Sequence, residues 1–112
     1  MKRMIADQKE FEELCKMASD SPWVGLDTEF NREGAYYPKL CLLQLSSPKF
    51  TVCIDPLADL DFSPFQIFLS NPAVKKIFHA ARQDIEALFV AFGSTPKHLF
   101  DTQIAAQLCG YR

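Results

Sequence analysis

The pattern of apolar segments changes near residue 55, and this change limits the fold more than any other feature of the sequence. Before it, the segments 23–30, 40–45 and 50–54 are each predicted to be a strand, and short connections join them. After it, segments with the periodicity of helices and of strands alternate. Short connections favour an antiparallel meander, whereas alternation favours parallel strands with helices between them. We therefore expect an α/β domain with one mixed sheet and helices on its faces.

Two helices are marked by residues at their first turns. Asp7, followed three residues later by Glu10, resembles a capping box and predicts a helix over 8–18. Pro64 stands where the first helical position is expected, because proline lacks the N–H that this position does not need. It predicts a second helix over 63–70.

The last third of the chain is expected to alternate between strand and helix. A strand over 74–78 precedes a helix over 81–92, which Gly93 is expected to end. A short strand over 99–100 then leads to Asp101, which is predicted to cap a final helix. The residues expected on the inner face of the longer helix are Ile85, Leu88, Phe89 and Phe92, and those of the final helix are Ile104, Ala105 and Leu108.

The composition is that of one globular domain. The chain has 112 residues, with 48% hydrophobic and 23% charged residues, so it can bury a core of its own. Its net charge of -2 argues against a protein that holds long stretches of nucleic acid by their phosphates. A small site that grips a few nucleotides through bound cations still fits, because the metals bring the positive charge.

The cysteines predict reduced, buried thiols. None of them is spaced as C-x-x-C and each lies in an apolar stretch, which favours neither a disulfide framework nor a zinc site. No apolar run follows the first residues and none is long enough to cross a membrane. We therefore expect a protein of a reducing compartment, the cytoplasm. The four residues are Cys15, Cys41, Cys53 and Cys109.

Asp27 and Glu29 are the first candidates for chemistry. Residues two apart on a strand point to the same face, about 6–7 Å apart at the backbone. Two carboxylates in that arrangement can bind one hard cation or bridge two. The alternative is a polar strand end that faces water, which is the commoner role of an isolated D-x-E.

Asp84 is the second candidate, in the first turn of its predicted helix. A negative charge there is favoured by the helix dipole, and that structural role is the alternative. If the preceding strand lies beside 23–30, however, Asp84 approaches Asp27. Three carboxylates around one point would repel each other unless cations lay between them, so the arrangement predicts a metal site formed by Asp27, Glu29 and Asp84.

The remaining polar residues carry weaker indications. His79 lies near the same edge and is expected either to contact a phosphate or to be a hydrogen-bonded structural histidine. Gln44 is expected to be a satisfied core amide, and Asp55 and Asp101 to be terminators and caps. His98 is expected in a surface loop. Four basic residues are candidates for phosphate contacts, with solvated surface as the alternative: Lys39, Lys75, Lys76 and Arg82.

Four stretches together resemble the ribonuclease D group of the DEDD superfamily. GLDTEF at 25–30 is similar to its first exonuclease motif, and YYPKLCLLQL at 36–45 to its second strand and the approach to it. FHAARQDIEAL at 78–88 is similar to the second motif, and DTQIAA at 101–106 to a further stretch of the group. Each stretch alone is weakly specific, but their order and spacing cover nearly the whole chain.

The resemblance implies a ribonuclease-H-like sheet and 3′–5′ hydrolysis of RNA ends, such as those of tRNA precursors, to nucleoside 5′-monophosphates. It implies two divalent cations, Mg²⁺ or Mn²⁺, with Asp27 bridging both. Glu29 would bind the metal that holds the attacking water, and Asp84 the metal nearer the leaving group. The residues expected near the single-stranded RNA 3′ end are Phe30, which would pack on the terminal nucleotide, and Thr28, His79 and Arg82.

The group's third motif, a tyrosine and a fourth aspartate on a later helix, does not occur in these residues, and Tyr111 lacks the aspartate that should follow it. We therefore expect residues 1–112 to form a partial exonuclease domain with the first and second motifs. Weak or absent activity is expected from these residues alone, and self-association through apolar surface that further helices would cover. The alternative is a non-catalytic module that binds nucleic acid or a protein partner.

Overall fold

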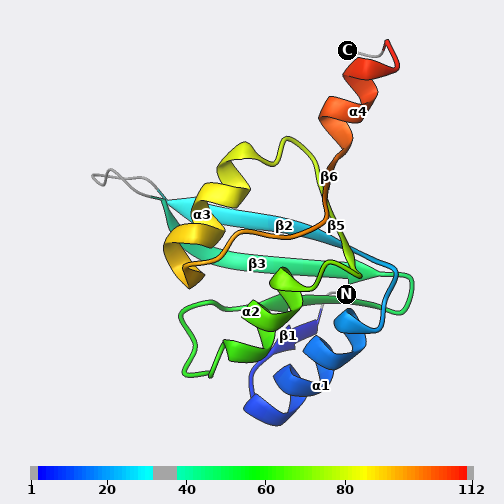
Figure 1. The fold of residues 1–112 in the computed structure, drawn as a ribbon. Coiled ribbons are helices and arrows are strands. Elements are labelled where there is room, and N and C mark those ends of the chain that lie inside the picture. The colour runs from blue at the N-terminus through cyan, green and yellow to red at the C-terminus, as the bar shows by residue number, and fades with distance from the viewer. Residues whose placement is uncertain (1–2, 32–37, 111–112) are drawn as a thin grey trace.

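The computed structural model describes residues 3–31 and 38–110, which form one six-stranded mixed sheet with helices against it (Figure 1). The strands are β1 (Arg3–Ile5), β2 (Trp23–Asn31), β3 (Lys39–Ser47), β4 (Phe50–Ile54), β5 (Lys75–Phe78) and β6 (Leu99–Asp101). The helices are α1 (Gln8–Ser19), α2 (Ser63–Ser70), α3 (Arg82–Phe92) and α4 (Thr102–Leu108). The expected α/β class and its mixed sheet are confirmed.

The spatial order of the strands is β1-β4-β3-β2-β5-β6. As predicted, β2, β3 and β4 form an antiparallel meander, and β5 and β6 add to β2 in parallel. The sequence did not predict β1, which pairs in parallel with β4 at the other edge of the sheet. A strand of three residues is too short to show an alternating pattern, and only Ile5 of its residues is buried.

The predicted helix signals act as expected. Asp7 is the N-cap of α1, and its carboxylate accepts a hydrogen bond of 2.8 Å from the backbone N–H of Glu10. Pro64 lies in the first turn of α2. Gly93 ends α3 in the left-handed conformation, with φ of 70°, which glycine adopts without the steric cost that a Cβ would add.

The core lies between the sheet and α1, α2 and α3, which cover the same face of it (Figure 1). Alternate residues of the central strands supply its floor, and phenylalanines of the helices supply much of its upper layer. The largest buried apolar side chains are Phe11, Phe65, Phe68, Phe78, Leu43, Leu45, Ile54, Leu69 and Leu88. In the described ranges these three helices lie on one face, and α4 extends away beyond β6.

Several predictions of burial were wrong. Phe89 of α3 is 56% exposed, because the buried face of that helix runs through Ala87, Leu88 and Phe92. No residue of α4 is buried. Among the cysteines, which are all free thiols, Cys15 and Cys53 are buried as expected, but two are exposed. The exposed pair are Cys41 and Cys109.

Lys76 is buried rather than on the solvated surface. It is fully buried on β5, with its Nζ 5.2 Å from the centre of the Phe68 ring and hydrogen-bonded to the backbone carbonyl of Asn71. Asn71 is the C-cap of α2, so the ammonium group lies at the negative end of that helix. Burial lowers the pKa of Lys76 to about 8. This lysine is therefore part of the core and is not available to a phosphate.

Candidate active site

Alternation along β2 separates its polar residues onto two faces. Val24, Leu26 and Thr28 face the helices and are buried, whereas Asp27 and Glu29 are exposed on the opposite face. The prediction that these two carboxylates share a face is therefore consistent with the observed strand. Asp27 pairs in register with Gln44 of the neighbouring strand β3.

Asp84 approaches β2 from α3. The parallel pairing of β5 with β2 brings the start of α3 over β2, and Asp84 lies in the first turn of that helix. The hydroxyl group of Thr28 donates a hydrogen bond to Oδ1 of Asp84. Thr28 was predicted near the substrate, and this stays a prediction; in the structure its side chain is on the helix-covered face and is bonded to Asp84.

The pKa of Asp84 reflects its burial and its neighbours on β2. Burial raises the pKa of the Asp84 carboxyl above its usual value, and the negative charge of Asp27 raises it further. The hydrogen bond from Thr28 acts in the opposite direction, because it stabilises the ionised form. A cation placed beside these two acids would relieve the repulsion between them.

The donor set fits a hard divalent cation by its chemistry. Asp27 and Glu29 offer exposed carboxylate oxygens on one face, and Asp84 offers a third from the neighbouring helix. Within residues 3–31 and 38–110, however, no group of three or more His, Cys, Asp or Glu side chains is arranged closely enough to hold a metal ion. The three-carboxylate ligand set therefore stays a prediction, and the contact that the structure does establish is the one between α3 and β2.

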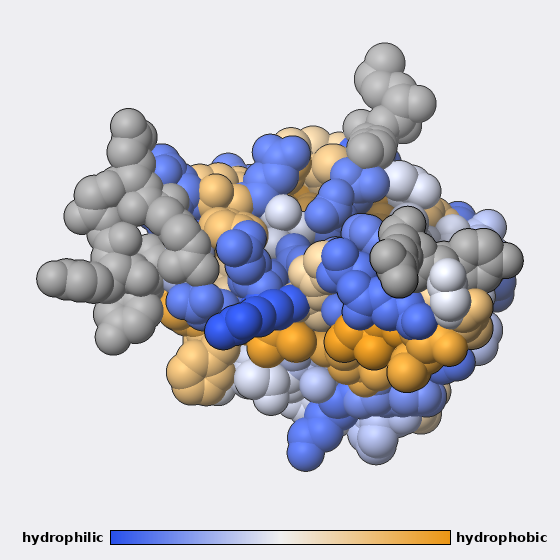
Figure 2. All heavy atoms as spheres, turned by 90° about the horizontal axis from the view of Figure 1, so that it is seen from above, coloured by the Kyte–Doolittle hydropathy of each residue, from blue (hydrophilic) through white to orange (hydrophobic). Residues whose placement is uncertain are grey.

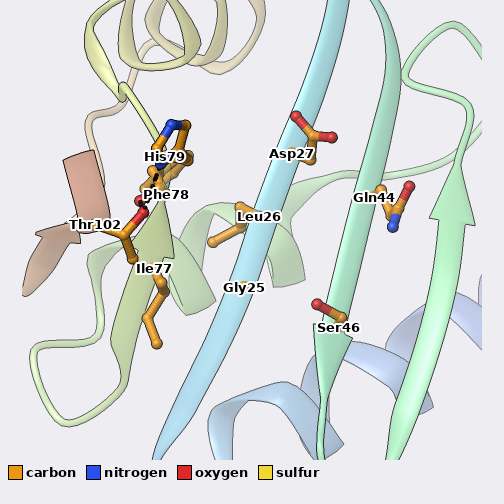
Figure 3. A pocket seen from close by; sticks show the side chains of 9 residues that line it. All are labelled: Gly25, Leu26, Asp27, Gln44, Ser46, Ile77, Phe78, His79 and Thr102. Carbon is orange, nitrogen blue, oxygen red and sulfur yellow. Dashed lines mark hydrogen bonds between the residues drawn. The ribbon is translucent and has the colours of Figure 1, made fainter. Parts of the chain in front are cut away.

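A hollow of about 460 Å³ lies on the open face of the sheet, next to Asp27 (Figure 3). Its floor includes Gly25, where a Cβ would lie 2.9 Å from Oγ of Ser46 on β3. In Figure 3, Asp27 of β2 and His79 of the β5–α3 loop lie near the same end of the hollow. The lining residues are Gly25, Leu26, Asp27, Gln44, Ser46, Ile77, Phe78, His79 and Thr102.

Only Asp27 and His79 of the nine lining residues were predicted as part of a site. Gly25, Ser46 and Ile77 occupy matching positions on three adjacent strands, so they lie side by side on the face that carries Asp27. The sequence pattern shows that each of them alternates with buried neighbours along its strand. The order of the strands, which places them side by side, could not be predicted from the sequence. Thr102 reaches the hollow from the start of α4, and its hydroxyl lies 2.9 Å from Nδ1 of His79.

The other predicted residues are more scattered. Arg82 is exposed at the start of α3, and Phe30 is half-buried and packs against the core, next to an irregularity in the pairing of β2 with β3.

Asp101 is the N-cap of α4, as expected, and accepts hydrogen bonds from Gln103 and Ile104. The stretch expected to approach β3 includes Tyr36 and Tyr37, which lie outside the described residues, as does Tyr111. Asp55 accepts a hydrogen bond from the N–H of Leu57, which fits a strand terminator.

The arrangement of an acidic strand beside the first turn of a helix can be compared with known proteins. A model of the 3′–5′ exonuclease family matches residues 2–112. The chain belongs to the 3′–5′ exonuclease family. Within it, ribonuclease D of Bartonella henselae is 45% identical over 112 residues, which cover 99% of this chain and 28% of that protein.

Solved structures agree with the family assignment. The crystal structure of Escherichia coli ribonuclease D, an exoribonuclease involved in structured RNA processing, matches with a TM-score of 0.93 and 38% identity. The match covers 100% of this chain and 30% of that one. Trypanosoma brucei ribonuclease D in complex with RNA U12 shares the fold, with a TM-score of 0.81 and 24% identity over 91% of this chain and 37% of that one. The expected ribonuclease-H-like fold is thus confirmed, and this exonuclease chain spans less than a third of the length of these first two relatives.

Proposed function

We propose that this chain carries the metal-binding acids of a 3′–5′ exoribonuclease that releases nucleoside 5′-monophosphates from RNA. The observation that supports this most is the position of Asp84, which accepts a hydrogen bond from Thr28 of β2 and whose pKa is raised in part by the charge of Asp27. An acid of α3 is thereby held against the strand that carries Asp27. Membership in the exonuclease family gives this arrangement its reaction class.

Each acid has a distinct part in the proposal. Asp27 would hold both divalent cations, Mg²⁺ or Mn²⁺, with Glu29 beside it for one and Asp84 for the other. When bound, such ions supply a water of lowered pKa and stabilisation of the departing 3′ oxygen. Thr28 keeps the Asp84 carboxylate in place and favours its ionised form, which is the form that a cation requires.

The hollow beside Asp27 suits a short length of a single strand better than a duplex. Its volume of about 460 Å³ is that of a site for a small ligand, and the net charge of -2 provides no extended basic surface. We therefore propose that it takes the last nucleotides of an RNA 3′ end. RNA is favoured over DNA because Escherichia coli ribonuclease D is described as an exoribonuclease and the Trypanosoma brucei enzyme was crystallised with RNA.

Metal binding tests the acidic centre in the chain itself. Calorimetric titration with Mn²⁺ should show binding to the wild type and at least tenfold weaker binding to Asp27→Asn, which loses the proposed bridging carboxylate. Asp55→Asn is the matched control, since it removes the same charge at the end of β4 and can keep the 2.8 Å bond to Leu57. Equal affinity in all three proteins would contradict the proposed centre.

A chimaera tests the activity. The present 112 residues would replace the aligned segment of Bartonella henselae ribonuclease D, to which they are 45% identical. The chimaera should release 5′-monophosphates from the 3′ end of labelled RNA when Mn²⁺ is present. A chimaera that binds RNA without shortening it, while the parent enzyme shortens it, would instead support a non-catalytic binding module.

A further inference from the structure

The loop between β5 and α3 is held by two consecutive residues of the β6–α4 junction. The carboxylate of Asp101 accepts hydrogen bonds from the backbone N–H groups of Ala80, at 3.0 Å, and Ala81, at 2.7 Å. The hydroxyl of Thr102 donates to the carbonyl of Phe78, at 3.1 Å, and lies 2.9 Å from Nδ1 of His79. Every residue from 78 to 81 is thus bonded to one of these two side chains.

Asp101 does more here than cap a helix. Oδ1 of Asp101 caps the N-terminus of α4, because it accepts hydrogen bonds from the backbone N–H groups of Gln103 and Ile104. The same oxygen also accepts a hydrogen bond from the backbone N–H of Ala80. Oδ2 bonds to Ala81. A serine would suffice for the cap, because one oxygen is all that a cap requires. A carboxylate is needed to hold the loop as well.

The backbone of the loop has an unfavourable conformation at Ala80. Ala80 has a φ of 58°, in the left-handed region that residues with a Cβ rarely adopt. A backbone in this region persists only where its surroundings fix it. The backbone N–H groups of Ala80 and Ala81 both donate hydrogen bonds to the carboxylate of Asp101, and these two bonds fix the backbone in this conformation.

The contact with Thr102 also decides which nitrogen of His79 carries hydrogen. The single hydroxyl hydrogen of Thr102 is donated to Phe78, so its oxygen accepts from Nδ1–H of His79. In the neutral imidazole, Nε2 is then the acceptor. Figure 3 shows the linked pair beside the hollow, near Asp27. His79 is thereby prepared to accept a hydrogen bond from a hydroxyl group, such as that of a ribose.

We propose that Asp101 and Thr102 form a positioning clamp for the acidic centre. By fixing residues 78–81 the clamp sets the direction in which α3 begins, and so places Asp84, three residues after Ala81, against Thr28. It also fixes the ring of His79 at the edge of the hollow. The part of this proposal that concerns metal rests on the proposed function, whereas the part that concerns the loop does not.

Thr102 is tested through the His79 ring. The ¹⁵N shifts of that imidazole in the wild type should show the proton on Nδ1. Thr102→Val removes the hydroxyl with little change of shape and should move the ring toward the Nε2–H form, while Thr102→Ser, which keeps the hydroxyl, should restore the wild-type spectrum. A general loss of stability would not produce this rescue. An unchanged ring in Thr102→Val would overturn this half of the clamp.

Asp101 is tested against a second aspartate N-cap of the same chain. Asp101→Ser keeps a cap but cannot reach both loop amides, and Asp7→Ser makes the same exchange on α1, away from the loop. Only Asp101→Ser should increase hydrogen exchange at the Ala80 and Ala81 amides and weaken the nuclear Overhauser contact between Thr28 and Asp84. Where Asp101→Ser does not fold, Asp101→Asn carries the same test, since it retains a single acceptor oxygen.

Mn²⁺ affinity separates the two proposals. We expect about tenfold weaker Mn²⁺ binding in Asp101→Ser and unchanged binding in Asp7→Ser, as for other residues that orient metal ligands. If wild type does not bind Mn²⁺, the proposed function fails, and the exchange and Overhauser measurements still decide whether the loop is clamped. If the loop loosens but Asp84 stays against Thr28 and Mn²⁺ binds as before, the positioning role is overturned.

Discussion

The hydroxyl of Thr28 on β2 donates a hydrogen bond to the carboxylate of Asp84 on α3, and this contact joins the strand of the first motif to the helix of the second. The two residues are 56 positions apart in the chain. Thr28 is 8% exposed, so its hydroxyl has no ready replacement from solvent. The hydrogen bond therefore holds the acid in place and also favours its ionised form.

Removing that hydroxyl should weaken metal binding. In Thr28→Val the pKa of Asp84 should rise further, because the side-chain hydrogen bond that favours the ionised form is lost while burial and the charge of Asp27 remain. Mn²⁺ affinity should fall by about tenfold, the usual effect of losing a group that orients a ligand. Calorimetry measures this, with Thr28→Ser as the control that keeps the hydroxyl. Wild-type affinity in Thr28→Val would show that the contact is only structural.

Asp84 should lower stability at neutral pH when no metal is present. Its folded-state pKa lies above the ordinary value, so the folded state binds more protons and unfolding becomes easier as pH rises from the ordinary pKa through the raised one. Asp84→Asn can still accept the hydrogen bond from Thr28 but carries no charge. Thermal unfolding without metal should therefore give a higher Tm for Asp84→Asn at pH 7, and the difference should shrink at acid pH. A lower Tm for the variant at both pH values would contradict this.

Lys76 should make stability rise with pH in the alkaline range. Its folded-state pKa is about 8 against an ordinary 10.5, so between these values the unfolded chain binds more protons and the folded state gains stability as pH increases. The full effect is on the order of 3 kcal/mol. Lys76→Met keeps the apolar stem and should lack this rise. Chemical unfolding of both proteins at pH 7.5 and pH 10 measures it, and parallel changes in the two would refute the assignment.

The apolar side chains of the C-terminal elements should promote self-association. Ile104 is 55% exposed, Leu108 84% and Phe100 41%, and the three line one shallow depression with Leu99 and Ala105. Figure 2 shows hydrophobic patches between hydrophilic areas on this upper side of the molecule. Sedimentation should reveal association at high concentration that the double variant Ile104→Lys, Leu108→Lys reduces. A wild type that stays monomeric throughout the concentration range would contradict the prediction.

The isolated 112 residues should shorten RNA poorly. The tyrosine and fourth aspartate that the resemblance to ribonuclease D leads us to expect are absent from these residues. Hydrolysis needs its water aimed within about 1 Å, and a misplacement of that size costs on the order of a hundredfold in rate. End-labelled RNA incubated with Mn²⁺ should therefore remain nearly intact with the isolated chain. Rapid trimming that Asp84→Asn abolishes would show that these groups are dispensable here.

In the part of the chain that the structure describes, none of the helices has the length and apolar character required to cross a bilayer. The longest, α1, has 12 residues and carries charged side chains on its outer face.

Local signals in the sequence determined most elements of this protein. Asp7, Pro64, Gly93 and Asp101 mark helix limits because capping and backbone preference act within a few residues of the chain. The shared face of Asp27 and Glu29 followed from the period of a strand in the same way. Sequence similarity indicated the family, since a model of the 3′–5′ exonuclease family matches nearly the whole chain.

Only the tertiary structure decided which of these residues meet. The parallel pairing of β5 with β2 brings Asp84 to Thr28, and that of β6 with β5 brings Asp101 and Thr102 to the loop that starts α3. Lys76 was expected on the surface and is buried, because its neighbours come from α2 rather than from its own strand. Contacts of this kind depend on strand order and on the packing of helices over the sheet. Those are set by the burial of the whole core, which no local stretch of sequence encodes.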